Sequence, residues 1–191
     1  ASFLASGQNV RPTRLLEAGF RFVKPTIEDF FEGTDHAAVD RLDLHRYMGT
    51  WYEIARFDHR FERGLSEVTA TYTLMPDGTV RVENRGCKHK KPYDVCKTAE
   101  GRAKIPDPSQ PGKLKVSFFL SFYSDYYVLE LDQDEYNYAL IGSSSDKYLW
   151  ILSRVPILPE EIKKKLLDAA TRRGYDVKKL IWVEQREKKI M

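Results

Sequence analysis

The sequence has no apolar run near the roughly 20 residues that a membrane-spanning helix needs. It also lacks a cationic start followed by an apolar stretch, which would mark a secretory signal. The chain also lacks an excess of charge of one sign, because 31 Lys and Arg residues alternate with 28 Asp and Glu residues along most of its length. This near balance gives no long-range field and argues against nucleic acid as a partner.

Catalytic and metal-binding motifs are also missing. The four histidines show no H-E-x-x-H spacing, and no G-x-S-x-G elbow occurs. The sequence therefore predicts no catalytic residue, no metal site and no cofactor.

Cysteine is scarce, with only Cys87 and Cys96, nine positions apart. The residues between them, KHKKPYDV, are typical of a turn between two strands, so a disulfide across a hairpin is favoured. An even count without a spare thiol also favours an oxidising compartment. Two alternatives stay open: a metal site that uses Cys87, His89 and Cys96, for which no fourth ligand is evident, and two free thiols.

The two ends of the chain differ from its middle. Residues 1–38 are predicted to form a partly helical extension, in which TIEDFF (26–31) starts a short helix with Thr26 as N-cap. The extension is too apolar for a free tail and is expected to pack on its own domain or on a neighbour, which leaves a homodimer open. Residues 186–191 form a basic tail.

Local basic clusters occur at KHKK (88–91) and REKK (186–189). Each is typical of a solvated hairpin tip or tail, and the alternative is contact with phosphate or a lipid surface. Because the sequence begins at Ala1 and not at Met, a signal peptide or lipid anchor upstream stays open, and with it association with a membrane.

Between about residues 50 and 155 the pattern changes to short segments with alternating β-branched and aromatic residues. Turn-forming segments such as MPDG, PDPSQPG and SSSDK separate them. Strands at such short spacing indicate a closed antiparallel sheet or a sandwich. The strand segments are VTATYTL, TVRVENRG, KLKVSFFL, YYVLELD, YALIGS, YLWILSR and, near the C-terminus, LIWVEQ.

One amphipathic helix follows the strands, in LPEEIKKKLLDAATRRG. Pro159 is expected at the first helical position, and Gly174 is expected just after the end. Ile162, Leu166 and Ala170 share one stripe, so the helix should lie against the outside of the sheet.

Two motifs carry a resemblance to a known family. The G-x-W-Y of Gly49, Trp51 and Tyr52 resembles the lipocalin signature at the head of the first barrel strand. In YLWILSRVP (148–156), Arg154 matches the lipocalin arginine of the last barrel strand. The resemblance covers about residues 39–185 and is strongest to bacterial outer-membrane lipocalins and apolipoprotein D, although a further family motif, T-D-Y, is present only as LDQD.

The resemblance implies an all-β fold: an eight-stranded antiparallel up-and-down barrel, closed at one end, with one C-terminal α-helix packed outside. It implies a structural role for Gly49, Trp51 and Arg154 at the closed end. The physics agrees, since a guanidinium stacked over an indole gains about 0.5 to 2 kcal/mol.

A barrel of this size holds a small ligand, and its wall positions alternate along each strand. With Trp51 facing inward, Glu53, Ala55 and Phe57 should follow, while Tyr72, Asn84 and Trp150 match cavity positions of apolipoprotein D. Each apolar position has plain core packing as its alternative. The predicted ligand-binding set is Glu53, Ala55, Phe57, Tyr72, Val82, Asn84, Val116, Phe118, Tyr126, Val128, Ile141, Trp150 and Leu152.

Further expectations concern Glu130, Gly101 and Ala103. The same alternation turns Glu130 inward, where it could pair with Arg154 at the closed end. Small side chains at Gly101 and Ala103 should leave room in the cavity.

The charged loop DHRFERG (58–64) is expected at the open mouth of the barrel. Arg60 and Arg63 would meet the carboxylate or phosphate of an amphiphile, with Phe61 as an apolar contact. The alternative is an ordinary solvated loop.

These observations predict a protein that carries or stores small hydrophobic or amphiphilic ligands such as fatty acids and lysophospholipids, and that is not an enzyme. The resemblance adds a role in envelope lipid maintenance and a location in the bacterial periplasm or outer membrane, or secretion. A lipid-modifying enzyme on the same barrel is the alternative function.

Overall fold

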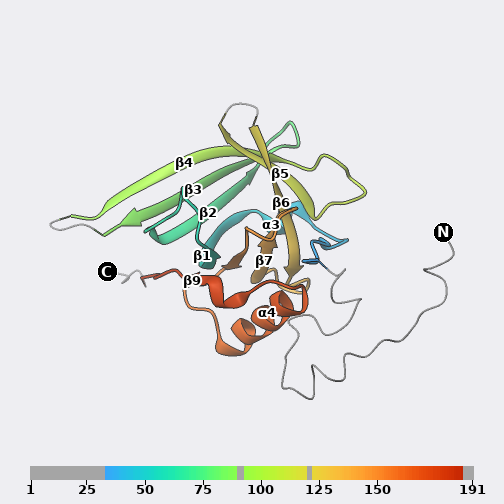
Figure 1. The fold of residues 1–191 in the computed structure, drawn as a ribbon. Helices are drawn as coiled ribbons and strands as arrows, with labels where there is room; N and C mark the ends of the chain where they lie inside the picture. The colour runs from blue at the N-terminus through green and yellow to red at the C-terminus, as the bar shows by residue number, and fades with distance from the viewer. Residues whose placement is uncertain (1–32, 90–92, 120–121, 187–191) are drawn as a thin grey trace, which may run out of the picture. The chain divides into compact units, whose positions relative to one another are not determined.

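The computed structural model describes residues 33–89, 93–119 and 122–186. The chain divides into two compact units, Ala1–Gly33 and Thr34–Met191, and the labelled helices and strands of Figure 1 belong to the second. The helix expected at 26–31 and the tail residues 187–191 lie outside the described residues. Within the described part, no helix is long and apolar enough to cross a membrane.

One antiparallel sheet contains every strand of the described residues, in the order β2-β3-β4-β5-β6-β7-β8-β1-β9 (Figure 1). The strands are β1 (Gly49–Phe57), β2 (Ser66–Leu74), β3 (Val80–Lys88), β4 (Val95–Lys104), β5 (Lys113–Phe119), β6 (Phe122–Leu131), β7 (Tyr138–Gly142), β8 (Trp150–Ser153) and β9 (Leu180–Trp182).

The first strand closes the sheet into a barrel. Its first half pairs with β2, from Gly49↔Tyr72 to Tyr52↔Thr69, and from Tyr52 onward it pairs with β8. Its last residues, Ala55 to Phe57, pair with β9, which lies outside the ring of eight. The predicted eight-stranded antiparallel barrel is therefore confirmed.

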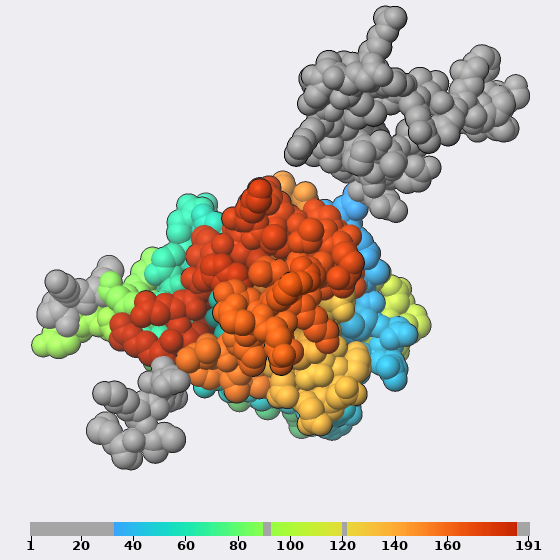
Figure 2. Space-filling model, turned by 90° about the horizontal axis from the view of Figure 1, so that it is seen from below, coloured from blue at the N-terminus to red at the C-terminus, as the bar shows by residue number. Residues whose placement is uncertain are grey.

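The predicted helix is α4 (Glu160–Arg172), one residue shorter at its start than expected because Pro159 is the N-cap. It buries Leu166, Ala169 and Ala170 against the outer side of the barrel. Figure 2 looks onto this face, where orange and red residues of α4 and the following segment cover the sheet. The outer layer is a second hydrophobic cluster, separate from the one inside the barrel.

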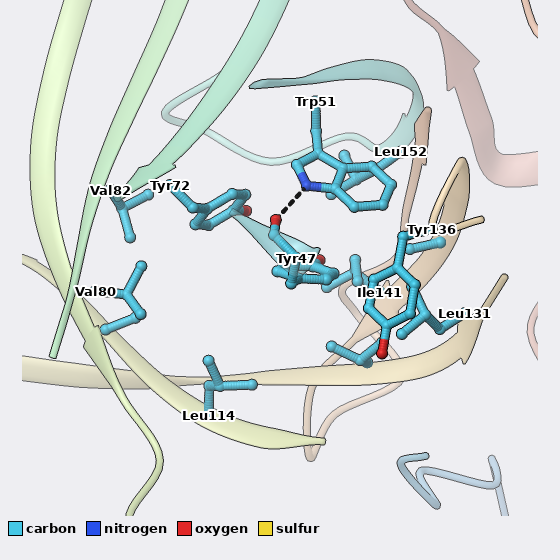
Figure 3. Close-up of a cluster of buried hydrophobic side chains, with 13 residues drawn as sticks. Tyr47, Trp51, Tyr72, Val80, Val82, Leu114, Leu131, Tyr136, Ile141 and Leu152 are labelled. Atoms are coloured by element: carbon cyan, nitrogen blue, oxygen red, sulfur yellow. Dashed lines mark hydrogen bonds between the residues drawn. The ribbon is translucent and has the colours of Figure 1, made fainter. Parts of the chain in front are cut away.

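A short helix, α3 (Leu44–Tyr47), precedes β1 and closes one end of the barrel with Trp51 and Arg154. The Trp51 ring is fully buried, and its Nε1 donates to the Tyr47 carbonyl at 2.9 Å, as the dashed line in Figure 3 marks. The guanidinium carbon of Arg154 lies 3.8 Å from the centre of the Trp51 ring. The Tyr47 ring packs 4.9 Å from the Trp51 ring between centres, and the side chains of Tyr47, Trp51 and Arg154 form the floor of the barrel.

Arg154 also satisfies the backbone around the floor. Its nitrogens donate to the carbonyls of Met48 at 2.8 Å, Thr50 at 2.9 Å and Tyr136 at 3.2 Å. The carbonyls of Arg46 and Tyr47 lie within reach of the same guanidinium. One side chain therefore joins α3, β1 and the β6–β7 connection.

Gly49 is required at the start of β1 by its backbone. Its φ of +91° lies in the region that side chains rarely adopt, and an added Cβ would come 3.4 Å from Arg154 Nη1. Glycine thus lets the chain turn from α3 into the barrel beside the arginine.

The predicted disulfide is present between Cys87 of β3 and Cys96 of β4. The two residues are direct partners in the antiparallel pairing, so the bridge crosses the hairpin as the sequence indicated. The alternatives of free thiols and of a cysteine metal site are wrong.

We expect Arg154→Met to lower the free energy of unfolding by about 2 to 4 kcal/mol, because it removes a charged donor from several partly buried carbonyls. Arg154→Lys should recover less than half of this loss, since an ammonium cannot reproduce the planar fork. Urea unfolding measures both. Arg172→Met, on the exposed side of α4, is the control, and an equal loss in the control would contradict the role of Arg154.

Candidate functional site

The barrel encloses a cavity of about 850 Å³ that opens to solvent. This volume is within the range of pockets that bury a whole small ligand. Figure 3 shows part of its inner wall, where Val80, Val82, Leu114 and Ile141 surround the tyrosines and Trp51 of the floor. The predicted set contributes ten residues to the lining: Glu53, Tyr72, Val82, Asn84, Val116, Phe118, Tyr126, Ile141, Trp150 and Leu152.

Ala55 and Phe57 do not line the cavity, and the alternation that placed them there is wrong. The pairing of β1 with β8 shifts between Glu53 and Ala55, which marks a β-bulge. A bulge adds one residue to a strand and reverses the faces of the residues that follow. Both side chains therefore pack in the outer cluster beneath α4.

A second bulge corrects the expectation for β6. Its pairing with β7 shifts between Val128 and Glu130. Val128 stays in the inner cluster, although it does not border the open cavity, whereas Glu130 faces outward. The Glu130 carboxylate pairs with Arg173 after α4 at 3.1 Å and not with Arg154.

The two small residues of β4 have different roles. Ala103 lines the cavity, as expected. Gly101 does not line the cavity. An added Cβ at this position would lie 2.6 Å from the Ser117 carbonyl and 2.7 Å from the Phe118 ring. Its lack of a side chain serves the close approach of β5.

Three tyrosine hydroxyls form the polar part of the inner end of the cavity. The Tyr126 hydroxyl lies 2.7 Å from that of Tyr47 and 2.9 Å from that of Tyr72. Burial raises the pKa of all three phenols, so each stays neutral across the physiological range. Tyr47 precedes the barrel, and its place in this group was not foreseen.

A cluster of buried charges lies at the side of the cavity. Arg56 donates to the Glu53 carboxylate at 2.6 Å and to the Glu62 carbonyl at 2.8 Å. The Glu62 carboxylate lies 2.8 Å from His59 Nε2 and accepts from Trp150 Nε1 at 3.2 Å. We name Glu53, Arg56, His59 and Glu62 the charged cluster; all four are buried.

Two buried carboxylates lie near each other in the charged cluster, and only that of Glu53 pairs with Arg56. Burial, with the nearby Glu62 carboxylate, raises the pKa of Glu53 to about 8, although Arg56 acts in the opposite direction. We therefore regard Glu53 as neutral at pH 7, holding a proton between the two acids. Glu53 and Glu62 both line the cavity, so this proton faces the ligand space.

The sequence predicted an inward Glu53 but not its partners Arg56, His59 and Glu62. His59 and Glu62 turn inward and hold the loop over the barrel, with the His59 ring 4.2 Å from Phe61 and 5.2 Å from Trp150 between ring centres. The available signal was Arg56 itself, because a cation that follows the apolar Ile54 and Ala55 in a strand needs a buried acceptor.

The two arginines of this loop do not lie where the sequence analysis expected them. Arg60 and Arg63 do not line the cavity, and Arg63 pairs with Asp58 at 2.7 Å on the surface. Phe61 does line the cavity, as expected.

The cations that border the cavity without an ion pair come from the β3–β4 hairpin, whereas Lys115 of β5 pairs with Asp125. Arg85, Lys88 and Lys97 are exposed and line the cavity, so they stand at its edge. None of the three has an ion-pair partner among the residues that the structure describes. We call these three residues the basic rim.

Asn84 supplies a polar group inside the wall. Its Oδ1 is buried and has no hydrogen-bond partner within the described ranges. A buried amide oxygen without a donor is costly, so a ligand donor or water would be favoured there.

A possible metal cluster lies outside the cavity but already holds a cation. Glu67, His89 and Asp94 bring one ligand atom each within 4.8 Å of one another. The guanidinium of Arg186 lies 3.3 Å from Glu67 and 3.2 Å from Asp94. These acids are therefore neutralised by the protein itself.

Comparison with protein families gives a match over the whole barrel. Residues 42–185 match a family model described as a lipocalin-like domain. Residues 1–33 match a model described as a domain of unknown function, DUF1731.

Curated relatives match the same part of the chain. Outer membrane lipoprotein Blc of Escherichia coli (strain K12) is 50% identical over 147 residues, which is 77% of this chain and 81% of the relative. Temperature-induced lipocalin-1 of Arabidopsis thaliana is 42% identical over 158 residues, covering 78% of this chain and 82% of the relative. Apolipoprotein D of Mus musculus is 34% identical over 154 residues, covering 76% and 78%.

Solved structures share the fold at lower identity. Insecticyanin from the tobacco hornworm Manduca sexta superposes with a TM-score of 0.65 at 23% identity, over 80% of this chain and 86% of that protein. Apocrustacyanin C1 gives 0.61 at 20% identity, over 76% and 81%. Both support the barrel architecture.

The raised pKa of Glu53 predicts a pH-dependent stability. In the unfolded chain the carboxyl ionises near pH 4.5, whereas in the folded protein it keeps its proton to about pH 8. The folded state binds the extra proton in this window, so the free energy of unfolding should fall as the pH rises from about 4.5 to 8. Glu53→Gln, a neutral mimic, should remove this part of the decline.

Thermal unfolding of both proteins at pH 5 and pH 9 is the measurement. The wild type should lose more of its Tm than Glu53→Gln between the two values, and Glu184→Gln, at an exposed site, should behave as the wild type. A Glu53→Gln protein that loses as much Tm as the wild type would show that Glu53 is ionised throughout.

Proposed function

This chain belongs to the lipocalin family, and on that premise we propose that its cavity binds single-chain amphiphiles of the fatty acid and lysophospholipid type. Members of the family bind small hydrophobic ligands. The observation that carries the finer proposal is the combination of a cavity of about 850 Å³, apolar over most of its wall, with an unpaired basic rim.

The ligand is proposed to lie with its chain inside and its head group at the rim. The inner wall offers Val80, Leu114, Ile141 and similar side chains, whose contact with an alkyl chain removes apolar surface from water. The polar groups of the inner end are neutral tyrosines, and Glu53 at the side of the cavity keeps its proton; none of them can compensate a buried anion.

The two buried arginines already have partners. Arg154 donates to backbone carbonyls beneath Trp51, and the terminal nitrogens of Arg56 donate to Glu53 and two carbonyls. The basic rim is free to meet a carboxylate or phosphate, and there the head group also keeps part of its hydration. The Asn84 amide lies between the two regions on β3 and could bind a hydroxyl of a glycerol backbone.

We propose a binding role and not a catalytic one. The pair of His59 and Glu62 is the nearest approach to acid–base machinery, yet His59 does not line the cavity and its ring is covered by Phe61 and Trp150. A ligand recovered unchanged after incubation, by mass spectrometry, would agree with this role, whereas a modified lipid that depends on Glu53 would favour the enzyme.

The location is proposed from the relatives. Blc is named as an outer membrane lipoprotein, and half of the aligned residues are identical to this chain. The Cys87–Cys96 disulfide is consistent with an oxidising compartment. We propose the bacterial envelope, either periplasm or outer membrane, or secretion, and a part in carrying or storing envelope lipids.

Ligand uptake is tested by filling the cavity. Delipidated protein titrated with oleate should show quenching of Trp150, which lines the cavity. Ala103→Phe places a ring in the ligand space and should weaken oleate binding by about tenfold or more, the equivalent of about 1.4 kcal/mol. Arg102→Phe, which places the same ring on the outer face of β4, should leave the affinity within about twofold of the wild type.

Trp182→Phe, at an exposed site on β9, should keep the quenching signal. The proposal fails if oleate and a lysophospholipid do not bind the wild type, or if Arg102→Phe weakens binding as much as Ala103→Phe.

The orientation is tested separately by reversing charge at the rim. Lys88→Glu and Lys97→Glu should each weaken oleate binding by about three- to tenfold at low salt, and added salt should reduce the difference. Oleyl alcohol, which has the same chain and no charge, should bind both variants as it binds the wild type. Lys178→Glu is the control on the far surface, and an equal loss for both ligands would place the head group elsewhere.

A further inference from the structure

Large aromatic side chains are exposed at the edge of the cavity. Phe119 and Phe122 face each other across the end of the β5–β6 hairpin and are 71% and 75% exposed. Phe61, on the β1–β2 loop, is 69% exposed. All three also line the cavity, so they stand at its edge; we call them the aromatic rim.

This exposure is unusual for isolated surface residues. Phenylalanine is commonly buried, and three exposed rings around one opening form an apolar surface of the kind that marks an interaction site. Phe118 and Tyr123, on the same hairpin, are also exposed, at 41% and 37%. The barrel interior does not need these side chains for its packing, since none of them belongs to either buried cluster.

The basic rim lies around the same opening. Arg85, Lys88 and Lys97 project from β3 and β4, and the cationic Lys104 amine lies 4.6 Å from the centre of the Tyr123 ring. The acids that line the cavity are compensated or buried: Asp125 pairs with Lys115 at 2.6 Å, and Glu53 and Glu62 belong to the charged cluster. The opening therefore combines apolar rings with net positive charge.

That combination suits an anionic lipid surface better than a second copy of the chain. Aromatic rings partition into the head-group region of a bilayer, and each nearby cation gains from anionic lipids. A two-fold contact through this face would bring the basic rims of two copies together, and like charges oppose such a contact.

We propose that the aromatic and basic rims dock the open end of the barrel onto an anionic phospholipid bilayer. The amphiphile would then pass between bilayer and cavity without crossing bulk water. This inference rests on the proposed function for the cargo, but the docking itself requires no ligand.

The test is cosedimentation of the delipidated full chain with vesicles. Vesicles containing phosphatidylglycerol should bind the wild type, and phosphatidylcholine vesicles should bind it much more weakly. The double variant Phe119→Ser/Phe122→Ser should lower the partition coefficient by about ten- to a hundredfold, since each ring loses its burial in the interface. Lys88→Glu/Lys97→Glu should lower it by about tenfold or more on the anionic vesicles.

The matched control is Val155→Ser/Ile157→Ser. These residues follow β8 beside the floor, are 48% and 63% exposed, and do not line the cavity. Their replacement should leave the partition coefficient within about twofold of the wild type. Equal losses in the two double variants would overturn the proposal.

A second comparison separates docking from ligand uptake. Ala103→Phe should weaken oleate binding but keep vesicle binding, because it changes only the interior. If Ala103→Phe also loses the vesicles, the signal comes from lipid uptake and the docking surface is refuted. If the wild type binds vesicles but no amphiphile, the proposed cargo fails and docking stands.

Self-association through the aromatic rim is the alternative to docking on a bilayer. Light scattering that shows a dimer abolished by Phe119→Ser/Phe122→Ser, with no vesicle binding by the wild type, would assign this face to self-association and overturn docking on a bilayer.

Discussion

The contact between Arg154 and Trp51 is the interaction on which the rest of the structure depends. The strands of a barrel leave backbone carbonyls at the end where the chain enters, and these need donors if that end is to be closed. One guanidinium supplies the donors for α3, β1 and the β6–β7 connection while it stacks on the indole. Because this end is sealed, the space above it is a cavity with one opening.

The charged cluster fixes the β1–β2 loop at the side of the cavity, as Arg154 fixes the floor. A loop that carries several charges would ordinarily lie in water, yet Arg56 donates to the Glu62 carbonyl and holds the loop inward. Burial and the nearby Glu62 carboxylate raise the pKa of Glu53, which therefore keeps a proton in the cavity wall. The same arrangement places Phe61 at the edge, so the loop joins the ligand space to the outer aromatic surface.

The fold was largely predictable because its signals are local or belong to motifs. Alternating residues identified most of the strands, although not β4, and the distance between the cysteines indicated the hairpin disulfide. Ten of the thirteen proposed ligand contacts line the cavity, since alternation holds wherever the pairing is regular. Of the other three, Val128 packs in the inner cluster without bordering the cavity. Ala55 and Phe57, like Glu130 outside this set, face outward because a bulge reverses the faces of a strand, and nothing in a single strand's sequence marks where its partner skips a residue.

The sequence by itself determined most strand segments, the outer helix and the lack of long-range charge, while the family resemblance implied the up-and-down strand order and the places of Gly49, Trp51 and Arg154 at the floor. Only the tertiary structure decided which charges are buried, where the two bulges fall, and that the free cations of the opening come from the β3–β4 hairpin and not from Arg60 and Arg63. The physical reason is that periodicity reports the face of a strand, whereas burial and ion pairing depend on side chains that come from distant strands and loops.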